Sequence, residues 1–198
     1  MSLMFYIVGL GNPGSEYEHT RHNVGFLALD FIVDSLRLPV PTKAGHLEGR
    51  YAEGSLCGQS VGLLYPETFM NNSGNSIKKL VPKDELHNLV VLYDDVALPF
   101  GSIKVSFDRG DGGHNGLKSI IGVMGSKEFI RVRIGVGPTS FWTGKPKLLS
   151  GDALPRYVLG KFTSKERTQL SEEILVDVQK AVCEIVREGY VKAMNTYN

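Results

Sequence analysis

Short apolar runs alternate along this chain with segments in which apolar residues recur at helical spacing. The short runs predict buried strands, and the periodic segments predict amphipathic helices packed against them. We expect strands over 5–9, 45–57, 59–65, 88–93, 102–107 and 130–136, and helices over 24–38, 73–80, 117–124 and 163–190. The pattern predicts an α/β fold: a single-domain three-layer sandwich over 1–198, with a mixed, mostly parallel sheet flanked by helices.

Local signals support several of these boundaries. Pro39 and Pro41 end the first helix, and Thr163 with Glu166 forms a capping-box pattern at the start of the last one. The strands over 45–57 and 59–65 are separated only by Cys57-Gly58, which predicts a hairpin and therefore a mixed sheet. Little periodicity is visible over 137–153, where we expect a mobile loop or lid.

The composition is that of an ordinary globular protein. The 198 residues are 42% hydrophobic and 22% charged, and no apolar stretch is long enough to predict a membrane span. The first apolar run is short, lacks a basic flank and ends in Gly-Asn-Pro-Gly, which is not typical of a signal peptide. We expect a cytoplasmic protein in which Cys57 and Cys183 are reduced packing residues.

The charge is nearly balanced overall but unevenly distributed. The net charge is +1, yet residues 101–161 contain ten basic and four acidic side chains, which gives +6 there and −5 elsewhere. This distribution favours a face that binds a polyanion. A solvated, lysine-rich surface without a partner is the alternative that charge alone leaves open.

Three glycines follow the first strand with the spacing Gly-x-Gly-x-x-Gly. Gly9, Gly11 and Gly14 match the phosphate-binding turn of dinucleotide-binding folds. In those folds a helix begins at once, whereas Pro13 precedes the third glycine here and the apolar helix starts about ten residues later. We therefore interpret the glycines as a sharp turn that exposes Asn12 at the end of a strand.

Polar residues that core packing would not select occur in four loops. They are Asn12 with Tyr17, His22 and Asn23; Asn71-Asn72; Asp94-Asp95; and His114-Asn115. Loops at the carboxyl ends of strands in an α/β sheet meet at one crevice, so we expect these side chains to converge. Local roles remain as alternatives, since Asn71 or Asn72 is suited to cap a helix and Asp94-Asp95 to form a turn. His19 is expected to be a surface residue.

A histidine, a carboxylate and several amides form a set suited to hydrolysis by activated water. The carboxylate would orient the imidazole base, and neutral amides would bond a developing oxyanion. No Gly-x-Ser-x-Gly elbow is present and neither cysteine lies in these loops, which disfavours a covalent nucleophile. His19, His22 and His114 with Asp94 could be metal ligands, but no His-Glu-x-x-His or Cys-x-x-Cys spacing occurs. We expect no metal and no cofactor.

Several motifs, taken in order, resemble bacterial peptidyl-tRNA hydrolases over about residues 5–190. The resemblance is carried by Ile7 to Gly14 with Tyr17 and Thr20-Arg21-His22-Asn23, by Pro66 to Asn71 with Ser73-Gly74, by Asp94-Asp95 before Leu98-Pro99, by Gly112 to Lys118, and by Arg131 to Gly137. It implies a monomeric, metal-independent α/β esterase that cleaves peptide from the 3′ end of tRNA. No membrane and no obligate protein partner are implied.

The resemblance also implies a role for each matching residue. His22 is the base, Asp94 orients it, and Asn12 and Asn71 engage the substrate near the ester. Asn12 is further implicated in the rejection of free aminoacyl-tRNA. The acceptor end or the peptide is expected to contact Tyr17, Phe69 and Asn115, with Met70 and His114 beside them, and the tRNA 5′ phosphate is expected to contact Arg133.

The chain departs from the family pattern at several positions. Tyr93 stands where the family usually has His, and Asp95 where Glu is common. Ser106 replaces a second basic residue that is associated with phosphate binding beside Arg133, so Lys104 or Arg109 is expected to substitute for it. A non-catalytic RNA-binding relative is the second hypothesis, which the intact His22 and Asp94 disfavour. A nucleotide-dependent oxidoreductase is the third.

Overall fold

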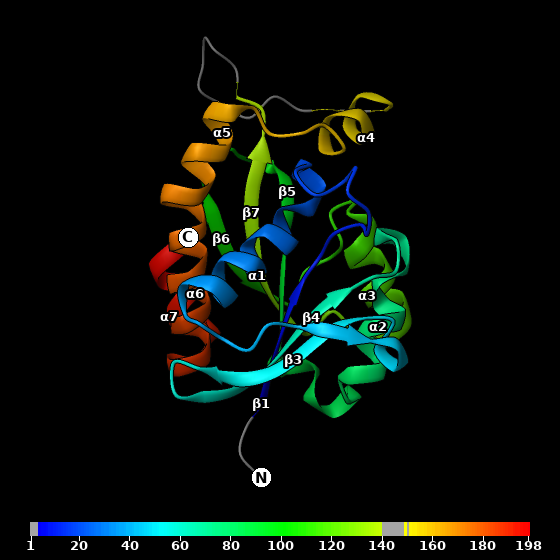
Figure 1. Ribbon diagram of the computed structural model, residues 1–198, viewed down its shortest axis with the longest axis vertical. Helices are drawn as coiled ribbons and strands as arrows, with labels where there is room; N and C mark the ends of the chain where they lie inside the picture. The colour runs from blue at the N-terminus through cyan, green and yellow to red at the C-terminus, as the bar shows by residue number, and fades with distance from the viewer. Residues whose placement is uncertain (1–3, 140–148, 150) are drawn as a thin grey trace.

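A seven-stranded mixed sheet forms the middle layer of the molecule (Figure 1). The computed structural model describes residues 4–139, 149 and 151–198. In spatial order the strands are β2 (Thr42–Ala44), β3 (Gly49–Leu56), β4 (Gln59–Pro66), β1 (Met4–Gly9), β5 (Leu89–Pro99), β7 (Ile130–Gly137) and β6 (Ile103–Phe107). The four central strands are parallel, and the outer strands on both sides pair antiparallel. The carboxyl ends of β1, β5 and β7 therefore meet at one edge of the sheet.

Helices cover both faces of this sheet, which confirms the predicted three-layer sandwich (Figure 1). The sheet is mixed as predicted, but it is not mostly parallel, because three of the six strand pairs that the structure describes are antiparallel. The helices are α1 (Val24–Ser35), α2 (Ser73–Leu80), α3 (Asn115–Met124), α4 (Ala153–Val158), α5 (Ser164–Gln169), α6 (Leu175–Glu188) and α7 (Tyr190–Tyr197). Alternation along β1 explains the two cores, because Phe5 and Ile7 join the cluster under α1 and α6 while Tyr6 and Val8 join the one under α2 and α3. Each helix in the described part of the chain is too short or too polar to span a bilayer.

The glycines after β1 allow α1 to lie directly on the strand end. A Cβ atom on Gly9 would lie 2.4 Å from the carbonyl oxygen of Gly25, and one on Gly25 would lie 2.3 Å from that of Leu92. The ring of Phe26 occupies the space that a Cβ atom on Gly11 would need, and Gly14 has a φ of 112° that favours glycine. The turn was predicted, but two of the three glycines serve close packing of backbone and side chain. No helix begins at this turn to bind a pyrophosphate, since α1 starts at Val24.

Most predicted elements are present, with differences at β5 and at the C-terminus. β5 continues through Asp94 and Asp95 to Pro99, so Asp94 lies within the strand rather than after it. The single predicted helix over 163–190 begins with the expected capping box at Thr163, passes through a π-helical segment over Leu170–Ile174, and ends before Gly189. The loop or lid predicted over 137–153 lies mostly outside the described residues.

The prediction of two reduced packing cysteines is wrong. Cys57 is exposed at the β3–β4 turn, Cys183 is half-buried on α6, and a disulfide of 2.14 Å joins their sulfur atoms. This pairing could not be read from local patterns because the two residues are 126 positions apart. The bond ties the hairpin to α6, and neither cysteine lines the main cavity of the described structure.

Candidate active site

His22 lies in a short 3-10 turn, Arg21–Asn23, at the carboxyl edge of the sheet. Two hydrogen bonds hold this turn. The Thr20 hydroxyl donates to the carbonyl of Tyr17 at 2.8 Å, and the amide of Asn23 donates to the carbonyl of Thr20 at 3.1 Å. α1 follows immediately, and its close contact with β1 fixes where the turn can lie. The imidazole is thereby held over the end of β5 and is only 9% exposed.

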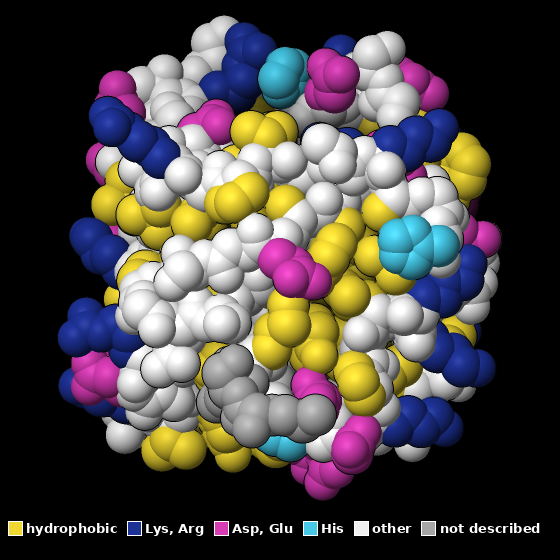
Figure 2. All heavy atoms as spheres, turned by 60° about the horizontal axis from the view of Figure 1, so that its bottom comes forward, with side chains coloured by type: hydrophobic (Ala, Val, Ile, Leu, Met, Phe, Trp, Pro, Cys, Tyr) yellow, Lys and Arg dark blue, Asp and Glu magenta, His cyan; other side chains and the backbone are white. Residues whose placement is uncertain are grey.

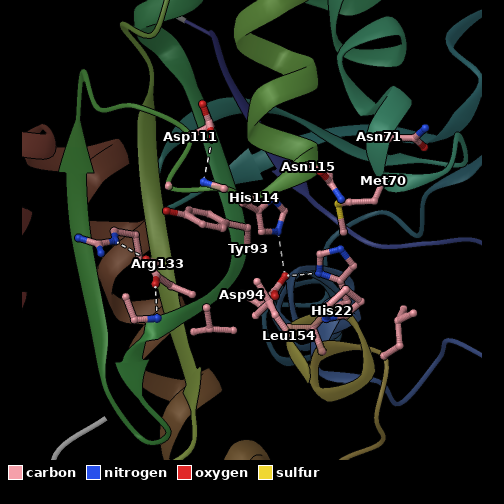
Figure 3. Close-up of a pocket in the computed structure, with 18 of the residues that line it drawn as sticks. His22, Met70, Asn71, Tyr93, Asp94, Asp111, His114, Asn115, Arg133 and Leu154 are labelled. Atoms are coloured by element: carbon pink, nitrogen blue, oxygen red, sulfur yellow. Dashed lines mark hydrogen bonds and ion pairs between the residues drawn. The ribbon is translucent and has the colours of Figure 1, made fainter. Parts of the chain in front are cut away.

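Two imidazoles share one oxygen of Asp94 (Figure 3). His22 Nδ1 lies 2.8 Å from Asp94 Oδ1, and His114 Nε2 lies 2.9 Å from the same oxygen. The carboxylate is buried, and the two rings are 5.0 Å apart. Tyr93 packs edge-on against His114 with ring centroids 5.0 Å apart, so an apolar face borders the second imidazole. The predicted convergence of His22, Asp94 and His114 is confirmed.

The hydrogen bonds assign a tautomer to each histidine. His114 caps α3, and its Nδ1 accepts from the amides of Gly116 and Leu117 at 3.1 and 3.3 Å. With Nδ1 accepting, Nε2 must carry the proton that His114 donates to Asp94. His22 likewise donates its Nδ1 proton to Asp94, which leaves the lone pair of its Nε2 available to accept a proton.

Burial and charge act in opposite directions on both members of the His22–Asp94 pair. Burial alone would lower the pKa of His22, but the charge and hydrogen bond of Asp94 outweigh it and raise that pKa above 6.5. Burial would raise the pKa of Asp94, but His22 and His114 hold it well below its usual range. Asp94 is thus a carboxylate at neutral pH, poised to stabilise a protonated His22.

The carboxamide of Asn12 is fixed by two neighbouring loops. Its Oδ1 accepts from the amide of Met70 at 2.8 Å. The Asn23 side chain accepts from the amide of Asn12 and donates to its carbonyl, each at 2.9 Å. These two bonds tie the Asn12 loop to the turn that carries His22. With Oδ1 occupied, Nδ2 is oriented as a donor, and no acceptor among the described residues contacts it. Asn12 is 8% exposed, so it is more buried than the predicted exposed position.

A cavity of about 1130 Å³ opens over these residues. Most of the predicted site residues line it, namely Asn12, His22, Phe69, Met70, Asn71, Asp94, His114, Asn115 and Arg133. Asn71 and Asn115 are exposed at its margin, and Phe69 presents an aromatic ring that is 57% exposed. Tyr17 and Lys104 do not line the cavity. His19 is exposed, as predicted.

Arg133 is held at the cavity wall by an acidic neighbour. Its Nε donates to Asp95 Oδ2 at 2.8 Å, and Asp95 Oδ1 accepts from the amide of Ala97 at 2.8 Å. Asp95 therefore orients the cation and bonds to the backbone of its own strand where the pairing of β5 with β7 is irregular, but it lies within β5 and does not form the turn predicted for Asp94-Asp95. Lys104 lies opposite Arg133 in the β6–β7 register, and Ser106, opposite Arg131, is buried.

Sequence reasoning missed the structural role of Arg131. Its guanidinium is fully buried over the ring of Phe129, at 4.4 Å, and donates to the carbonyls of Gly110 at 2.9 Å and of Arg109. Burial lowers the pKa of Arg131 from its usual value. These bonds anchor the glycine-rich loop 108–113, whose residues form one wall of the cavity. Arg133 lines the cavity and Arg131 does not, a difference that the strand predicted over 130–136 could not show.

Sequence reasoning also missed a second wall of the cavity, which α4 provides. Leu154, Pro155, Val158 and Leu159 of α4 and its end line the cavity, in a region that lacked a clear sequence pattern. Their signal was too weak because α4 has only six residues and follows the region assigned to a lid. Leu154 of this apolar wall lies beside His22 and Asp94 (Figure 3).

The facing nitrogens of His22 and His114 and an oxygen of Asp94 lie within 4.8 Å of one another, a spacing that could hold a metal ion. Both nitrogens are already engaged as N–H donors to Asp94. An ion would have to displace two protons and break both bonds. The arrangement fits a hydrogen-bonded relay of imidazole, carboxylate and imidazole, which orients a base without an ion.

The fold and the site together define a hydrolytic α/β enzyme. The sequence profile described as Peptidyl-tRNA hydrolase matches residues 6–198. Peptidyl-tRNA hydrolases of Clostridium beijerinckii and Desulfitobacterium hafniense are 42% identical over 197 residues and 43% identical over 202 residues, covering 98% of this chain and 96% and 100% of theirs. The crystal structure of the Acinetobacter baumannii peptidyl-tRNA hydrolase superposes with a TM-score of 0.82 at 32% identity, covering 100% of this chain and 96% of that one.

The chain belongs to the peptidyl-tRNA hydrolase family. This membership confirms the resemblance drawn from the motifs. The oxidoreductase hypothesis is wrong, because the chain belongs to a hydrolase family and the helix after β1 starts too late to bind a pyrophosphate at the turn.

Proposed function

We propose that this enzyme hydrolyses the ester that joins a peptide to the 3′ end of tRNA, with His22 as the base. The observation that carries the proposal is the donation of the Nδ1 proton of His22 to Asp94, which frees Nε2 on the cavity side. Family membership supports the substrate class. The reaction recycles tRNA from peptidyl-tRNA that has left the ribosome.

In the proposed reaction, His22 Nε2 takes a proton from a water molecule as its oxygen attacks the ester carbonyl carbon. Asp94 stabilises the imidazolium that forms. Asn12 Nδ2 donates to the substrate beside the ester, where it bonds the developing oxyanion. The tetrahedral intermediate then breaks its bond to the ribose 3′ oxygen, which receives the proton back from His22. The products are free tRNA and a peptide with a new carboxyl group, so atoms and protons balance.

Exposed polar and aromatic groups at the cavity margin are suited to the acceptor end of tRNA. Phe69 offers a ring on which a base or a peptide side chain can stack. Asn71 and Asn115 add exposed amides to the lining of the same cavity, which Met70 and His114 also line. Tyr17 is assigned to the same end of the substrate, although its half-buried ring lies outside the cavity lining.

The basic end of the β6–β7 pair is suited to a phosphate of the tRNA. Arg133 is oriented by Asp95, and Lys104 lies across from it on the neighbouring strand. Figure 2 turns the N-terminal end of the molecule forward, and there Lys and Arg side chains are spread around the margin rather than gathered at the centre. Ser106 is neutral and buried, so the basic contact falls to Lys104, which pairs with Arg133 across the strands, or to Arg109, which lines the cavity.

We further propose that the enzyme acts as a monomer in the cytoplasm, without a metal or cofactor. The substrate is a product of translation, which supports this location. In a reducing compartment the Cys57–Cys183 bond is expected to open. Because neither cysteine lines the cavity, activity should be the same with and without the bond.

The decisive assay compares N-acetyl-aminoacyl-tRNA with free aminoacyl-tRNA, in the presence of chelator. The proposal predicts rapid cleavage of the N-blocked substrate, release of intact tRNA, and little cleavage of the free aminoacyl ester. RNA binding without any ester cleavage would instead support the non-catalytic hypothesis. Cleavage that requires added metal would contradict the proposed mechanism.

A further inference from the structure

Arg21 precedes the catalytic histidine and reaches a segment about 140 residues further along the chain. Its Nη1 donates to the carbonyls of Gly160 and Lys161 at 3.3 and 3.1 Å. Its Nη2 contacts both carboxylate oxygens of Glu166, at 2.9 and 3.0 Å. The side chain is only 11% exposed, which is unusual for an arginine and makes these contacts hard to replace.

The backbone next to Arg21 is paired with the same segment. The amide of Arg21 donates to Gly160 at 3.1 Å, and the amide of Phe162 donates to the carbonyl of His19 at 3.1 Å. An isolated antiparallel bridge joins Thr20 to Lys161. The turn that carries His22 is therefore bonded to the connection between α4 and α5 through side chain and backbone together.

Glu166 serves both the arginine and the start of the last helical region. Its Oε2 accepts from the amide of Thr163 at 2.7 Å, and its own amide donates to the Thr163 hydroxyl at 3.2 Å. The capping box thus fixes the carboxylate before Arg21 binds it. Burial would raise the pKa of Glu166, but the bonds from Thr163 and Arg21 outweigh it and lower that pKa, so the partner stays charged.

Arg21 also contacts α4, the helix that carries the apolar wall of the cavity. Its guanidinium lies 4.5 Å from the ring centre of Tyr157 and 5.3 Å from that of Phe162. The Tyr157 hydroxyl donates to the carbonyl of Val136 at 2.7 Å, which ties α4 to the end of β7. Leu154 and Val158 on the same helix line the cavity. Figure 1 shows α4 beside the turn before α1, at the carboxyl edge of the sheet.

We propose that Arg21 is a positioning residue that fixes the His22 turn and the α4 wall to one support, Glu166. The inference rests on the proposed role of His22 as the base. Without the guanidinium, the turn loses four side-chain hydrogen bonds and its contact with α4. The His22 ring is then displaced from its position between Asp94 and the cavity for part of the time. The α4 wall of the cavity also becomes less firmly held.

The test uses Arg21→Met, which keeps the length of the stem, with Arg21→Lys and Glu166→Gln. Arg167→Met is the matched control, because Arg167 is the exposed neighbour of Glu166 and does not line the cavity. The first readout is the pKa of the His22 ring, followed by nuclear magnetic resonance. We expect that pKa to fall in Arg21→Met, because contact with Asp94 is what raises it.

The second readout is single-turnover cleavage of N-acetyl-aminoacyl-tRNA. We expect kcat to fall about 10–100-fold in Arg21→Met, an estimate based on the cost of misplacing a catalytic group, with a smaller change in KM. Arg21→Lys should recover part of the rate, and Arg167→Met should match the parent enzyme. The kcat of Glu166→Gln should lie between those of Arg21→Met and Arg167→Met, because glutamine keeps the helix cap but loses the negative charge. It also serves as the test variant if Arg21→Met fails to fold.

An unchanged His22 pKa together with an unchanged kcat in folded Arg21→Met or Glu166→Gln would overturn the inference. A change in thermal stability alone, with both readouts at the parent values, would do the same. The two hypotheses fail separately. Full activity of His22→Ala would refute the proposed function, whereas the ring titration tests Arg21 whatever that outcome.

Discussion

Two parts of the cavity wall are built on opposite principles. At the end of β5, Asp94, His22 and His114 engage one another, and Asn12 is bonded to the adjoining loops, with little exposure to solvent. At the β6–β7 pair, Asp95 is the one side-chain partner of Arg133 among the described residues, and Lys104 lies outside the cavity lining. The first region is preorganised for a reaction, whereas in the second Arg133 lines the cavity with a side chain that is 13% exposed and ion-paired with Asp95.

The difference follows from what each region must do. A base works only if its tautomer and direction are fixed before substrate arrives, so its neighbours must be bonded in advance. A phosphate contact depends on accessible positive charge, and water or salt occupies it between turnovers. Changes in the first region should therefore act on kcat by large factors, and changes in the second should act on binding by small ones.

Removal of the base should produce the largest effect. We expect His22→Ala to lower kcat by about 10²–10⁴-fold, the usual contribution of a general base. His19→Ala is the matched control, since His19 is exposed and does not line the main cavity. Single-turnover cleavage of N-acetyl-aminoacyl-tRNA measures both, and equal loss in the two variants would show that the rate does not depend on a base at His22.

Asp94→Asn should come next and should also change the pH dependence. Neutral His22 is the active form, so activity falls as pH drops through its pKa, which Asp94 raises above 6.5. Without the carboxylate charge that pKa falls, and the acid limb of the kcat profile moves to lower pH. We expect kcat to drop by about 10²-fold or more because the tautomer is no longer enforced. An acid limb that stays in place would indicate another titrating group.

Asn12→Ala should reduce kcat by about 10²-fold, the typical cost of one lost oxyanion donor. The same change also frees the amide of Met70, so part of the loss comes from the loop that carries it. Asn75→Ala, at an exposed position on α2, is the control. A large rise in KM with kcat unchanged would assign Asn12 to ground-state binding instead.

Arg133→Met should have a smaller effect, confined to binding. We expect a several-fold rise in KM and a salt dependence of log KM that is shallower by about 0.7–0.9, as for one phosphate contact. Arg187→Met, exposed on α6, should leave both quantities unchanged. Identical salt slopes for Arg133→Met and the parent enzyme would remove Arg133 from phosphate recognition.

Chelation should have the smallest effect. Because hydrogen bonds occupy the nitrogens that face Asp94, prolonged treatment with chelator should leave kcat and KM unchanged. The assay is the same cleavage reaction, repeated after readdition of zinc or magnesium. Loss of activity that either ion restores would show that the cluster holds a metal during turnover.

The same contrast explains how far the sequence could predict the structure. Local patterns place β1, α2 and the capping box at Thr163 correctly, because each depends on neighbouring residues. The convergence of Asn12, His22 and Asp94 could also be predicted, because the carboxyl ends of parallel strands meet at one edge of a sheet. The tautomer of His114 depends on two α3 amides, and the partner of Arg21 is about 140 residues away, so neither was available from local sequence.

The central claim is that Asp94 holds His22 as the Nδ1–H tautomer, with Nε2 free to act as the base. Nitrogen-15 resonance of the His22 ring, recorded above its pKa in the free enzyme, tests this directly. The account predicts a proton on Nδ1, slow to exchange with water, and an unprotonated Nε2. A ring that carries its proton on Nε2 would contradict the account.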